Sequence, residues 1–372
     1  MKIQQFFGFC IYHIEKIYYK VYYILNNIMG TNGGDCFLKK IGTIIAIVSA
    51  ALLIVFLVYD GMFNRQSSKD FFAMDTVISA KVTGRDSDLC VEKIEKLVTD
   101  LDGILSRHDK KSEVTALNSG VSDRVISDRL LVYLHTLIDI SRKSGGAFDF
   151  TIGALSDLWS FGKNPKIPDG RDISAALTVS GYEKLSLEGN RVTKPDGMLI
   201  DFGATGKGIA LDEIRTVLEN SNAKSAVVSV GGSVLLYGKE KVTVGIRDPY
   251  GNAGRSIASV ELSNTCISTS GSYERCFEVN GKNYHHILDP ETGYPVDNGL
   301  ISVTVISESG VVTDALSTAC FVLGIENGMK LAKEYGCEAI FITADKKIFT
   351  TEKVSSEIRI TDSDYTFMNY ES

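Results

Sequence analysis

The stretch Met198-Leu199-Ile200-Asp201-Phe202-Gly203-Ala204-Thr205-Gly206-Lys207-Gly208 determines how the middle of the chain folds. Its apolar first half predicts a strand over 198–202, and a helix is predicted over 209–221. Backbone N–H groups in a glycine-rich loop before a helix can hold phosphate, and a lysine there contacts phosphate as a point charge. The spacing departs from a Walker A motif, because Gly208 occupies the hydroxyl position. A plain glycine-rich turn is therefore the alternative.

The elements on either side of this loop predict an α+β fold with largely antiparallel sheets and packed helices. Helices and strands follow each other without the strict alternation of a parallel α/β protein. Helices are expected at 89–105, 129–144, 173–180, 209–221, 311–323 and 326–335. Strands are expected at 72–82, 184–188, 191–194, 198–202, 226–230, 233–237, 242–247, 256–262, 266–269, 275–279, 301–307 and 339–343.

The N-terminal part of the chain predicts a membrane anchor over residues 39–60. Residues 41–59 are apolar or small and are long enough to cross a bilayer, and Lys39 and Lys40 precede them. The positive-inside rule puts residues 1–38 in the cytoplasm and the rest outside, in a single-pass protein of the cell membrane. A buried core helix is the alternative, and the segment fits a cleaved signal peptide poorly. Residues 1–36 are either a cytoplasmic segment or an upstream extension before a start at Met29.

Composition and charge narrow the class of protein. The chain has 372 residues, and its formal net charge of −7 argues against nucleic acid as a partner. Five of the seven cysteines follow the predicted anchor, and no two of these form a C-x-x-C pair, which argues against a zinc site. Five is an odd number, so a monomer cannot pair them all in disulfides. We expect most of them to be buried as small hydrophobic residues. The five are Cys90, Cys266, Cys276, Cys320 and Cys337.

A second informative stretch runs from His285-His286 through Asp289-Pro290 and Thr292-Gly293 to Tyr294-Pro295. Proline and glycine at these positions predict a tight, irregular loop, and such loops on a rigid sheet often hold functional residues. Histidine titrates near neutral pH and serves as a general base or a metal ligand. The alternative is a structural histidine whose hydrogen bonds are satisfied.

Asp314 and Thr318 follow the next predicted strand and lie one helical turn apart. Their oxygens can then reach one hard cation from the same helix face. The alternative is a helix N-cap followed by an ordinary helical threonine. A base beside a Mg²⁺ site suggests phosphoryl or nucleotidyl transfer. Asp149, after Gly145-Gly146, is either a functional residue or simply a cap on the next turn.

In order and spacing, a set of segments over about 72–339 resembles the ApbE family of FAD:protein FMN transferases. These segments are 73–76, 106–118, 145–149 with the following Thr-Ile-Gly, 201–208, 229–232, 245–249, 268–275, 285–295 and 313–319. The resemblance implies an ApbE-like domain over 71–362, reached through a linker at 61–70 and followed by a polar tail at 363–372. It also implies transfer of FMN from FAD to a Thr or Ser hydroxyl of a partner flavoprotein, with release of AMP.

The resemblance also implies roles for individual residues. His286 matches the family's catalytic base. The Mg²⁺ ligands would be the Ala204 carbonyl and the side chains of Asp314 and Thr318. The positions that match FAD contacts are Met74, Asn118, Ala147, Phe148, Asp149, Lys207, Ser270, Ile287 and Leu288. The implied partners are FAD and acceptor subunits of extracytoplasmic electron-transfer systems.

The chain departs from the family pattern at two places. Thr205, Gly206 and Ile209 replace the family's Ile, Ala and Tyr, which suggests a looser adenine or flavin side of the pocket. The loop at 107–111 is more charged than a flavin contact requires. Two other functions compete with transfer, namely Mg²⁺-dependent hydrolysis of FAD to FMN and AMP, and binding of FAD without catalysis. The intact His286 argues against pure binding, and the choice between Mg²⁺ and Mn²⁺ stays open.

Overall fold

The computed structural model describes residues 64–368, apart from 120–122, 163–164 and 252–253, and scattered positions between 16 and 61. Contacts divide the chain into Met1–Arg65 and Gln66–Ser372. The predicted cytoplasmic segment and most of the predicted anchor lie outside the described residues. Among those described, no helix combines the length and the apolar character that a bilayer span needs. The anchor thus stays a prediction.

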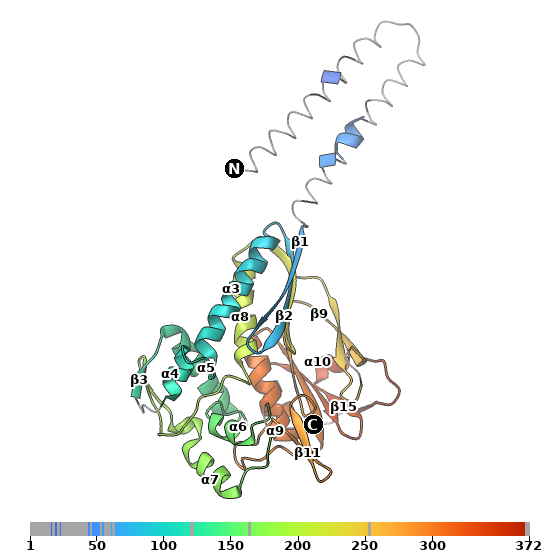
Figure 1. Cartoon of the computed structure of the whole chain (residues 1–372). Helices are drawn as coiled ribbons and strands as arrows, with labels where there is room; N and C mark the ends of the chain where they lie inside the picture. Colours follow the sequence, from blue (N-terminus) through green and yellow to red (C-terminus); the bar gives the residue numbers. More distant parts are fainter. Residues whose placement is uncertain are drawn as a thin grey trace, which may run out of the picture. The chain divides into compact units, whose positions relative to one another are not determined.

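A nine-stranded sheet forms the centre of the second unit (Figure 1). Its neighbouring strands pair antiparallel, except for the last two, which pair parallel. The predicted α+β fold with largely antiparallel sheets is confirmed. In spatial order the strands are β1 (Gln66–Ala73), β2 (Thr76–Gly84), β6 (Ala223–Val230), β7 (Ser233–Tyr237), β10 (Thr265–Gly271), β13 (Leu300–Ser307), β14 (Glu338–Thr343), β15 (Lys347–Thr350) and β17 (Thr366–Met368).

Three smaller sheets accompany the large one. The first contains β16 (Arg359–Ile360), β9 (Ser256–Leu262) and β8 (Val242–Arg247). The second contains β3 (Asp123–Val125), β5 (Arg191–Thr193) and β4 (Ser186–Glu188). The third is the hairpin of β11 (Cys276–Val279) and β12 (Lys282–His285), which leads directly into the predicted histidine loop.

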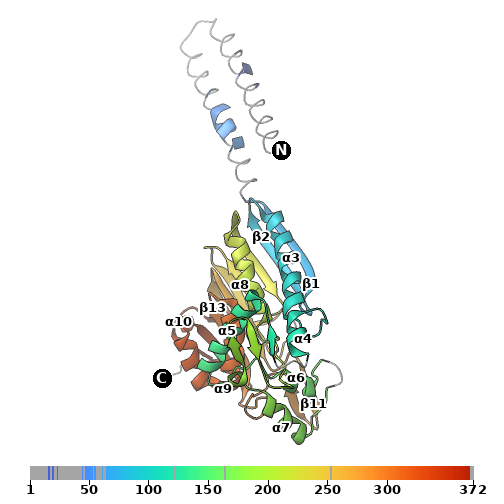
Figure 2. The same ribbon diagram turned by 90° about the vertical axis from the view of Figure 1, so that its left-hand side faces the viewer.

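Three helices, α3, α8 and α9, lie along one face of the large sheet (Figures 1 and 2). The helices are α3 (Ser87–Leu105), α4 (Glu113–Asn118), α5 (Asp128–Lys143), α6 (Gly153–Trp159), α7 (Gly170–Val179), η1 (Tyr182–Lys184), α8 (Gly206–Glu219), α9 (Gly310–Glu334) and α10 (Glu352–Ser355). Apolar residues recur at helical spacing on the sheet-facing side of α3, as Val91, Ile94 and Val98 show. This amphipathic pattern is why the helices pack on the sheet.

Both faces of the C-terminal half of the large sheet are covered. On β14, Ala339 and Phe341 point to the helices, whereas Ile340 and Ile342 point to a second core shared with β8 and β9. Successive side chains of a strand point to opposite faces, so a fully apolar strand is expected where both faces are buried. This part of the sheet is therefore buried on both faces.

Several predicted boundaries need correction. The strand predicted at 72–82 is a hairpin of β1 and β2, because Met74 and Asp75 have φ values of 52° and 56° and form a turn. The predicted linker at 61–70 overlaps β1, which begins at Gln66. The tail predicted after residue 362 contains β17, which pairs with β15. The two helices predicted at 311–323 and 326–335 are confirmed as the two parts of α9, because Gly324, at φ 76° and ψ −176°, is not helical and separates them.

An aromatic cluster holds a small lobe against the β11–β12 hairpin. Trp159 is fully buried and stacks on Phe161 and Tyr284, with ring centroids 5.6 and 5.7 Å apart. Phe277 of β11 stacks in turn on Tyr284. The lobe contains α6, which was not predicted, and α7, which corresponds to the helix predicted at 173–180.

Candidate functional site

The candidate site lies where α8 crosses α9 at a contact between two glycines. A Cβ atom on Gly208 would stand 2.1 Å from the Gly310 carbonyl oxygen, and one on Gly310 would stand 2.4 Å from the Gly208 carbonyl oxygen. Only glycine allows two backbones to approach so closely. This contact brings the glycine-rich loop before α8 beside the first turns of α9. Gly208, which departs from the Walker A pattern, is therefore the residue that permits the crossing.

Asp314 is buried at this crossing, with 4 % of its surface exposed. Its Oδ2 accepts from the Gly208 N–H at 2.6 Å, and its Oδ1 accepts from the Ser233 hydroxyl at 2.6 Å. One turn later the Thr318 hydroxyl hydrogen-bonds with that of Ser270 at 3.2 Å. The structure thus brings together three of the residues that the sequence singled out, Ser270, Asp314 and Thr318.

These oxygens suit a hard divalent cation. A carboxylate offers about four lone-pair directions, and the two donors on Asp314 leave the others uncommitted. Ala204 is exposed, two residues before α8, whose start Asp314 caps. Among the described residues no group of three or more His, Cys, Asp or Glu side chains forms a metal site. The predicted set has a single carboxylate, so a bound cation would need further oxygens from substrate and water, as Mg²⁺ does.

The turn between β1 and β2 also contacts the start of α8. A Cβ atom on Gly206 would lie 3.1 Å from Cε of Met74. A Cβ atom on Gly231 would lie 2.9 Å from the Thr76 hydroxyl oxygen and 3.4 Å from Cδ of Lys207. Met74 and Lys207, both predicted to contact FAD, therefore flank the start of α8 together.

His286 follows β12 directly and faces a cationic environment. Its backbone N–H donates to the Arg275 carbonyl oxygen at 3.0 Å. Its Nδ1 is buried without a hydrogen-bond partner among the described residues. Burial, and then the positive charges of Arg275 and Lys207, lower the pKa of His286 to about 4. The imidazole is neutral at physiological pH, the form that a general base requires.

His285 has a structural role that the sequence did not assign. Its Nε2 donates to the Val296 carbonyl oxygen at 2.9 Å, and its Nδ1 accepts from the Ile287 N–H at 3.3 Å. This pairing fixes one tautomer, with the proton on Nε2. Burial lowers the pKa of His285, which keeps the ring neutral. Its ring also packs edge-on against Phe321. His285 therefore holds the backbone of the next residues in place.

The rest of the histidine loop is closed by side-chain contacts. Asp289 accepts from the Glu291 N–H at 2.8 Å through Oδ1 and from the Thr292 hydroxyl at 3.1 Å through Oδ2. The Trp159 Nε1–H donates to the Gly293 carbonyl oxygen at 2.9 Å. Ile287 and Leu288, predicted to contact FAD, are both almost fully buried. The loop is rigid at both ends, as a positioned base needs.

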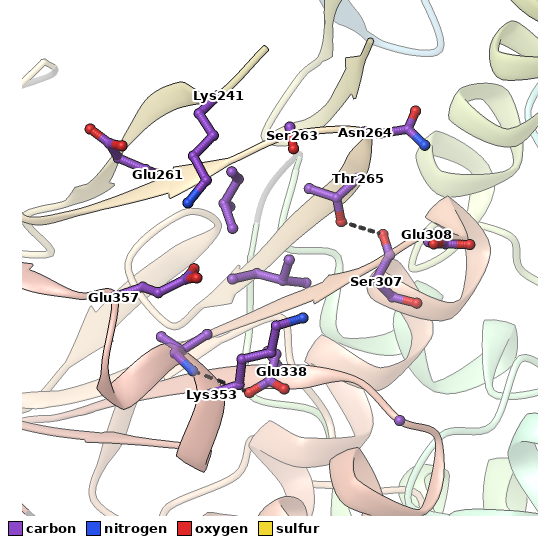
Figure 3. Close-up of a pocket in the computed structure, with 14 residues that line it drawn as sticks. Lys241, Glu261, Ser263, Asn264, Thr265, Ser307, Glu308, Glu338, Lys353 and Glu357 are labelled. Atoms are coloured by element: carbon purple, nitrogen blue, oxygen red, sulfur yellow. Dashed lines mark hydrogen bonds between the residues drawn. The ribbon is translucent and has the colours of Figure 1, made fainter. Parts of the chain in front are cut away.

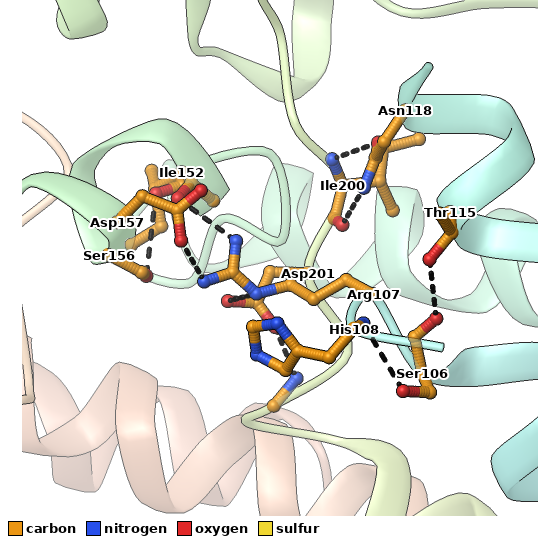
Figure 4. Close-up of polar contacts among 12 residues, drawn as sticks. Ser106, Arg107, His108, Thr115, Asn118, Ile152, Ser156, Asp157, Ile200 and Asp201 are labelled. Atoms are coloured by element: carbon orange, nitrogen blue, oxygen red, sulfur yellow. Dashed lines mark hydrogen bonds and ion pairs between the residues drawn. The ribbon is translucent and has the colours of Figure 1, made fainter. Parts of the chain in front are cut away.

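A polar network beside the glycine-rich loop accounts for one charge of the segment at 107–111, that of Arg107 (Figure 4). Arg107 pairs with Asp157 at 2.6 Å and with Asp201 at 3.3 Å, and Asp201 accepts from the Gly203 N–H at 2.8 Å. The charge of Arg107 is used to hold the loop, which sequence reasoning missed.

Asn118 belongs to the same network. Its amide forms two hydrogen bonds of 2.8 Å with the backbone of Ile200, one through each end. Both ends of this amide therefore hold the segment that leads into the glycine-rich loop (Figure 4). The strand predicted at 198–202 is wrong, because this segment forms only an isolated bridge, between Leu199 and Ile152. Its predicted contact with FAD stays a prediction.

Asp149 makes internal contacts too. Its Oδ1 accepts from the backbone N–H and the hydroxyl of Thr151, and its Oδ2 accepts from the Tyr182 N–H. Burial raises the pKa of Asp149, and these hydrogen bonds oppose the rise. Ala147 and Phe148 beside it are buried. This segment fits the capping alternative, and nothing in the structure tests its predicted FAD contacts.

Thr205 is fully buried, and its hydroxyl has no hydrogen-bond partner among the described residues. It occupies the N-cap position of α8 but makes no side-chain cap. The expectation that this departure loosens the substrate site stays a prediction. An unpaired buried hydroxyl costs free energy that an apolar side chain of the same shape does not.

Replacing Thr205 by valine is expected to raise the free energy of unfolding by about 1 kcal/mol, a rise in Tm of about 2 °C for a unit of this size. Differential scanning calorimetry would measure it. Thr313 provides the contrast, because its hydroxyl donates to the Gly310 carbonyl oxygen at 2.8 Å and bonds with the Ser268 hydroxyl at 2.9 Å. The change Thr313→Val should lower Tm, and equal effects of both changes would contradict the argument.

A separate pocket of about 480 Å³ lies at the other end of β10 and β13 (Figure 3). Thr265, Ser307 and charged side chains including Lys241, Glu338 and Lys353 line it. Ser270 is at the opposite end of β10, and a strand rises about 3.3 Å per residue, so the pocket is separate from Ser270 and the Asp314 cluster.

Comparisons with known proteins agree with this geometry. The ApbE family model matches residues 74–341. The FAD:protein FMN transferase of Treponema pallidum is 33 % identical over 297 residues, covering 73 % of this chain and 82 % of that protein. One from Klebsiella pneumoniae is 31 % identical over 309 residues, covering 81 % and 97 %. In solved structures, the ApbE protein of Thermotoga maritima superposes with a TM-score of 0.74 at 30 % identity, over 79 % of this chain and all of that one. The apo flavinyl transferase ApbE of Pseudomonas stutzeri gives 0.69 at 30 % identity, over 78 % and 95 %.

Proposed function

Because the chain belongs to the ApbE family, we propose that it transfers the FMN part of FAD to a Thr or Ser hydroxyl of an acceptor flavoprotein. The observation that carries the proposal is the buried Nδ1 of His286, which has no hydrogen-bond partner among the described residues and is influenced by the positive charges of Arg275 and Lys207. A pyrophosphate is an anion, and a neutral base beside cations suits attack of a hydroxyl on phosphorus. The chain is therefore an enzyme, a transferase.

The proposed reaction exchanges the phosphoanhydride bond of FAD for a phosphoester bond to the acceptor. A ring nitrogen of His286 takes the proton of the acceptor hydroxyl, whose oxygen forms a bond to the FMN phosphorus. The bond from that phosphorus to the bridging oxygen breaks, and AMP leaves with the electron pair. Lys207 and Arg275 place positive charge near the base, which suits the charge that develops on the phosphate oxygens. Positioning by the rigid loop supplies much of the rate in such transfers.

The cation would be Mg²⁺ held by the Ala204 carbonyl and the side chains of Asp314 and Thr318. When bound, it would neutralise pyrophosphate charge and stabilise the leaving AMP. The support is the chemistry of these oxygens and the uncommitted lone pairs of the buried Asp314. No thiolate or imidazole belongs to the set, which suits Mg²⁺ better than a softer metal.

A mass measurement tests the function directly. The full chain is incubated with FAD, MgCl₂ and a candidate acceptor flavoprotein, and the acceptor is expected to gain the mass of one FMN while AMP appears. EDTA should prevent the gain. Release of FMN and AMP in the presence of several acceptors, with no adduct on any of them, would replace the proposal with the alternative, hydrolysis of FAD by the same site.

The pH dependence of transfer should reflect the low pKa of His286. The base works only when neutral, and kcat/KM follows the free enzyme. Since the pKa is about 4, kcat/KM should stay level as pH falls through about 6.5, the ordinary value for histidine, and decline only near pH 4. Removing a neighbouring cation raises the pKa, so Arg275→Gln should move this acid limb to higher pH.

The control for the pH experiment is Arg171→Gln, which removes an exposed arginine from α7. It should leave the acid limb in place. A parent enzyme that loses activity around pH 6.5, with no response to Arg275→Gln, would contradict the assignment of His286 as a base with a depressed pKa.

We infer from the sequence that residues 39–60 anchor the enzyme in the cell membrane, with the catalytic unit outside and extracytoplasmic flavoprotein subunits as acceptors. The apolar run at 41–59 and the preceding Lys39 and Lys40 support this topology. Cysteines introduced before Lys39 and after Asn64 should differ in labelling by a reagent that does not cross membranes. Equal labelling would refute the topology.

A further inference from the structure

The crossing of α8 and α9 carries the same pattern on both helices. Gly208 is followed one turn later by Asp212, and Gly310 is followed one turn later by Asp314. Residues four apart share a helix face. Because the two glycines are the point of backbone contact, each aspartate stands beside the crossing on its own helix.

Each aspartate caps the start of the other helix. Asp314 accepts from the N–H of Gly208 at the start of α8. Asp212 accepts from the N–H groups of Gly310 and Val311 at the start of α9, the second at 3.0 Å, and from the Ser309 hydroxyl at 2.9 Å. The first N–H groups of a helix have no partner within it, and a carboxylate is favourable there. The two caps together fix how far one helix can slide along the other.

The two carboxylates differ in how many of their lone pairs already accept a hydrogen bond. Asp212 receives three donors, all from the start of α9. Asp314 receives two, from Gly208 and Ser233. With about four lone-pair directions on a carboxylate, Asp314 can still bind a cation, whereas Asp212 is committed to the helix. The pattern is therefore shared, but Asp314 keeps more free lone pairs than Asp212.

We infer that Asp212 is a positioning residue for the divalent cation site, an inference that rests on the proposed function. Asp212 does not touch the cation. It holds the first turn of α9 against α8, and so keeps Asp314 and Thr318 in place beside the start of α8. Groups that orient metal ligands in this way typically change metal affinity by about 10- to 100-fold when they are removed.

The test uses the full chain with FAD and Mn²⁺, a spectroscopic probe for the cation, and no acceptor protein. Free Mn²⁺ is measured by electron paramagnetic resonance, which gives an affinity that is independent of any transfer. The change Asp212→Asn replaces one acceptor oxygen with an NH₂ group, which cannot accept from the backbone N–H groups of α9. It should weaken Mn²⁺ binding by about 10- to 100-fold. The Mg²⁺ concentration that gives half of the maximal transfer rate should rise by a similar factor. The transfer rate at saturating Mg²⁺ should change much less.

A matched control is available on the same helix. Glu213 accepts from Arg129 at 2.6 Å and lies next to Asp212, but it faces α5 and not α9. The change Glu213→Gln should lower Tm without altering the Mn²⁺ affinity. If Asp212→Asn does not fold, Ser309→Ala, which removes one donor to Asp212, should shift the affinity in the same direction by a smaller factor.

The outcomes separate this inference from the proposed function. A parental Mn²⁺ affinity in Asp212→Asn, an equal loss in Glu213→Gln, or a parent protein that does not bind Mn²⁺ would each overturn the inference. If Asp212→Asn does not fold, an unchanged Mn²⁺ affinity in Ser309→Ala would also overturn the inference. Weakened binding in Asp212→Asn alone, with no acceptor labelled by the parent, would leave the inference standing and remove transfer as the function.

Discussion

Replacing His286 by alanine is expected to lower kcat for FMN transfer by about 10²- to 10⁴-fold, the usual contribution of a positioned general base. The variant should still fold, because the loop is held by His285, by Asp289 and by the bond from Trp159 to Gly293. It should also still bind FAD, since the cationic groups and the cation ligands remain. Quenched-flow measurement of FMN transfer, with FAD binding followed by flavin fluorescence, separates the two effects.

His135 gives a matched control for this variant. It is exposed on α5, away from the site, so His135→Ala should transfer FMN at the parental rate. A His286→Ala protein that binds FAD and transfers FMN within a few-fold of the parental rate would show that another group accepts the proton.

The second large effect is expected from Gly208→Ala. A methyl group there would stand 2.1 Å from the Gly310 carbonyl oxygen, and both partners are backbone that cannot rotate away. Overpacking of this kind costs about 3 kcal/mol. The helices must separate, so the bond from the Gly208 N–H to Asp314 is lost as well. We expect a large fall in the midpoint of urea unfolding and loss of Mg²⁺-dependent FAD binding.

Gly103 shows what the same substitution does where space is open. It lies within α3, and a Cβ atom there would meet nothing within 4 Å. Alanine is the better helix former by about 1 kcal/mol, so Gly103→Ala should stabilise the protein slightly. If the midpoint of urea unfolding of Gly208→Ala equalled that of the parent protein, the inference that α8 and α9 touch at this glycine would be wrong.

Sequence patterns predicted the fold class and most elements because their signals are local. The predicted helix at 209–221 corresponds to α8, and the apolar run at 301–307 corresponds to β13. The β1–β2 turn escaped, because Met74 and Asp75 adopt positive φ without the glycine or asparagine that usually marks such a turn. The aromatic lobe escaped too, since its rings meet only after α6 and the β11–β12 hairpin pack together.

The candidate site was predictable as a set of residues and not as a geometry. His286, Asp314 and Thr318 were recognised by their chemistry and by resemblance. Asp212 was missed, because its partners on α9 are far along the chain and only the folded structure joins them. A repeated Gly-x-x-x-Asp spacing at Gly208 and Gly310 was the one signal that could have indicated it.

The hydrogen bond from Trp159 to Gly293 also has an optical consequence. The chain contains a single tryptophan, and that indole is buried against the loop that carries His286. Emission from the indole therefore arises from one place, a ring whose N–H is tied to the backbone of the catalytic loop. The isoalloxazine ring of FAD absorbs at the wavelengths at which tryptophan emits. Energy transfer from Trp159 to bound FAD would therefore quench the tryptophan fluorescence. The protein thus carries its own unlabelled reporter of loop order and substrate occupancy.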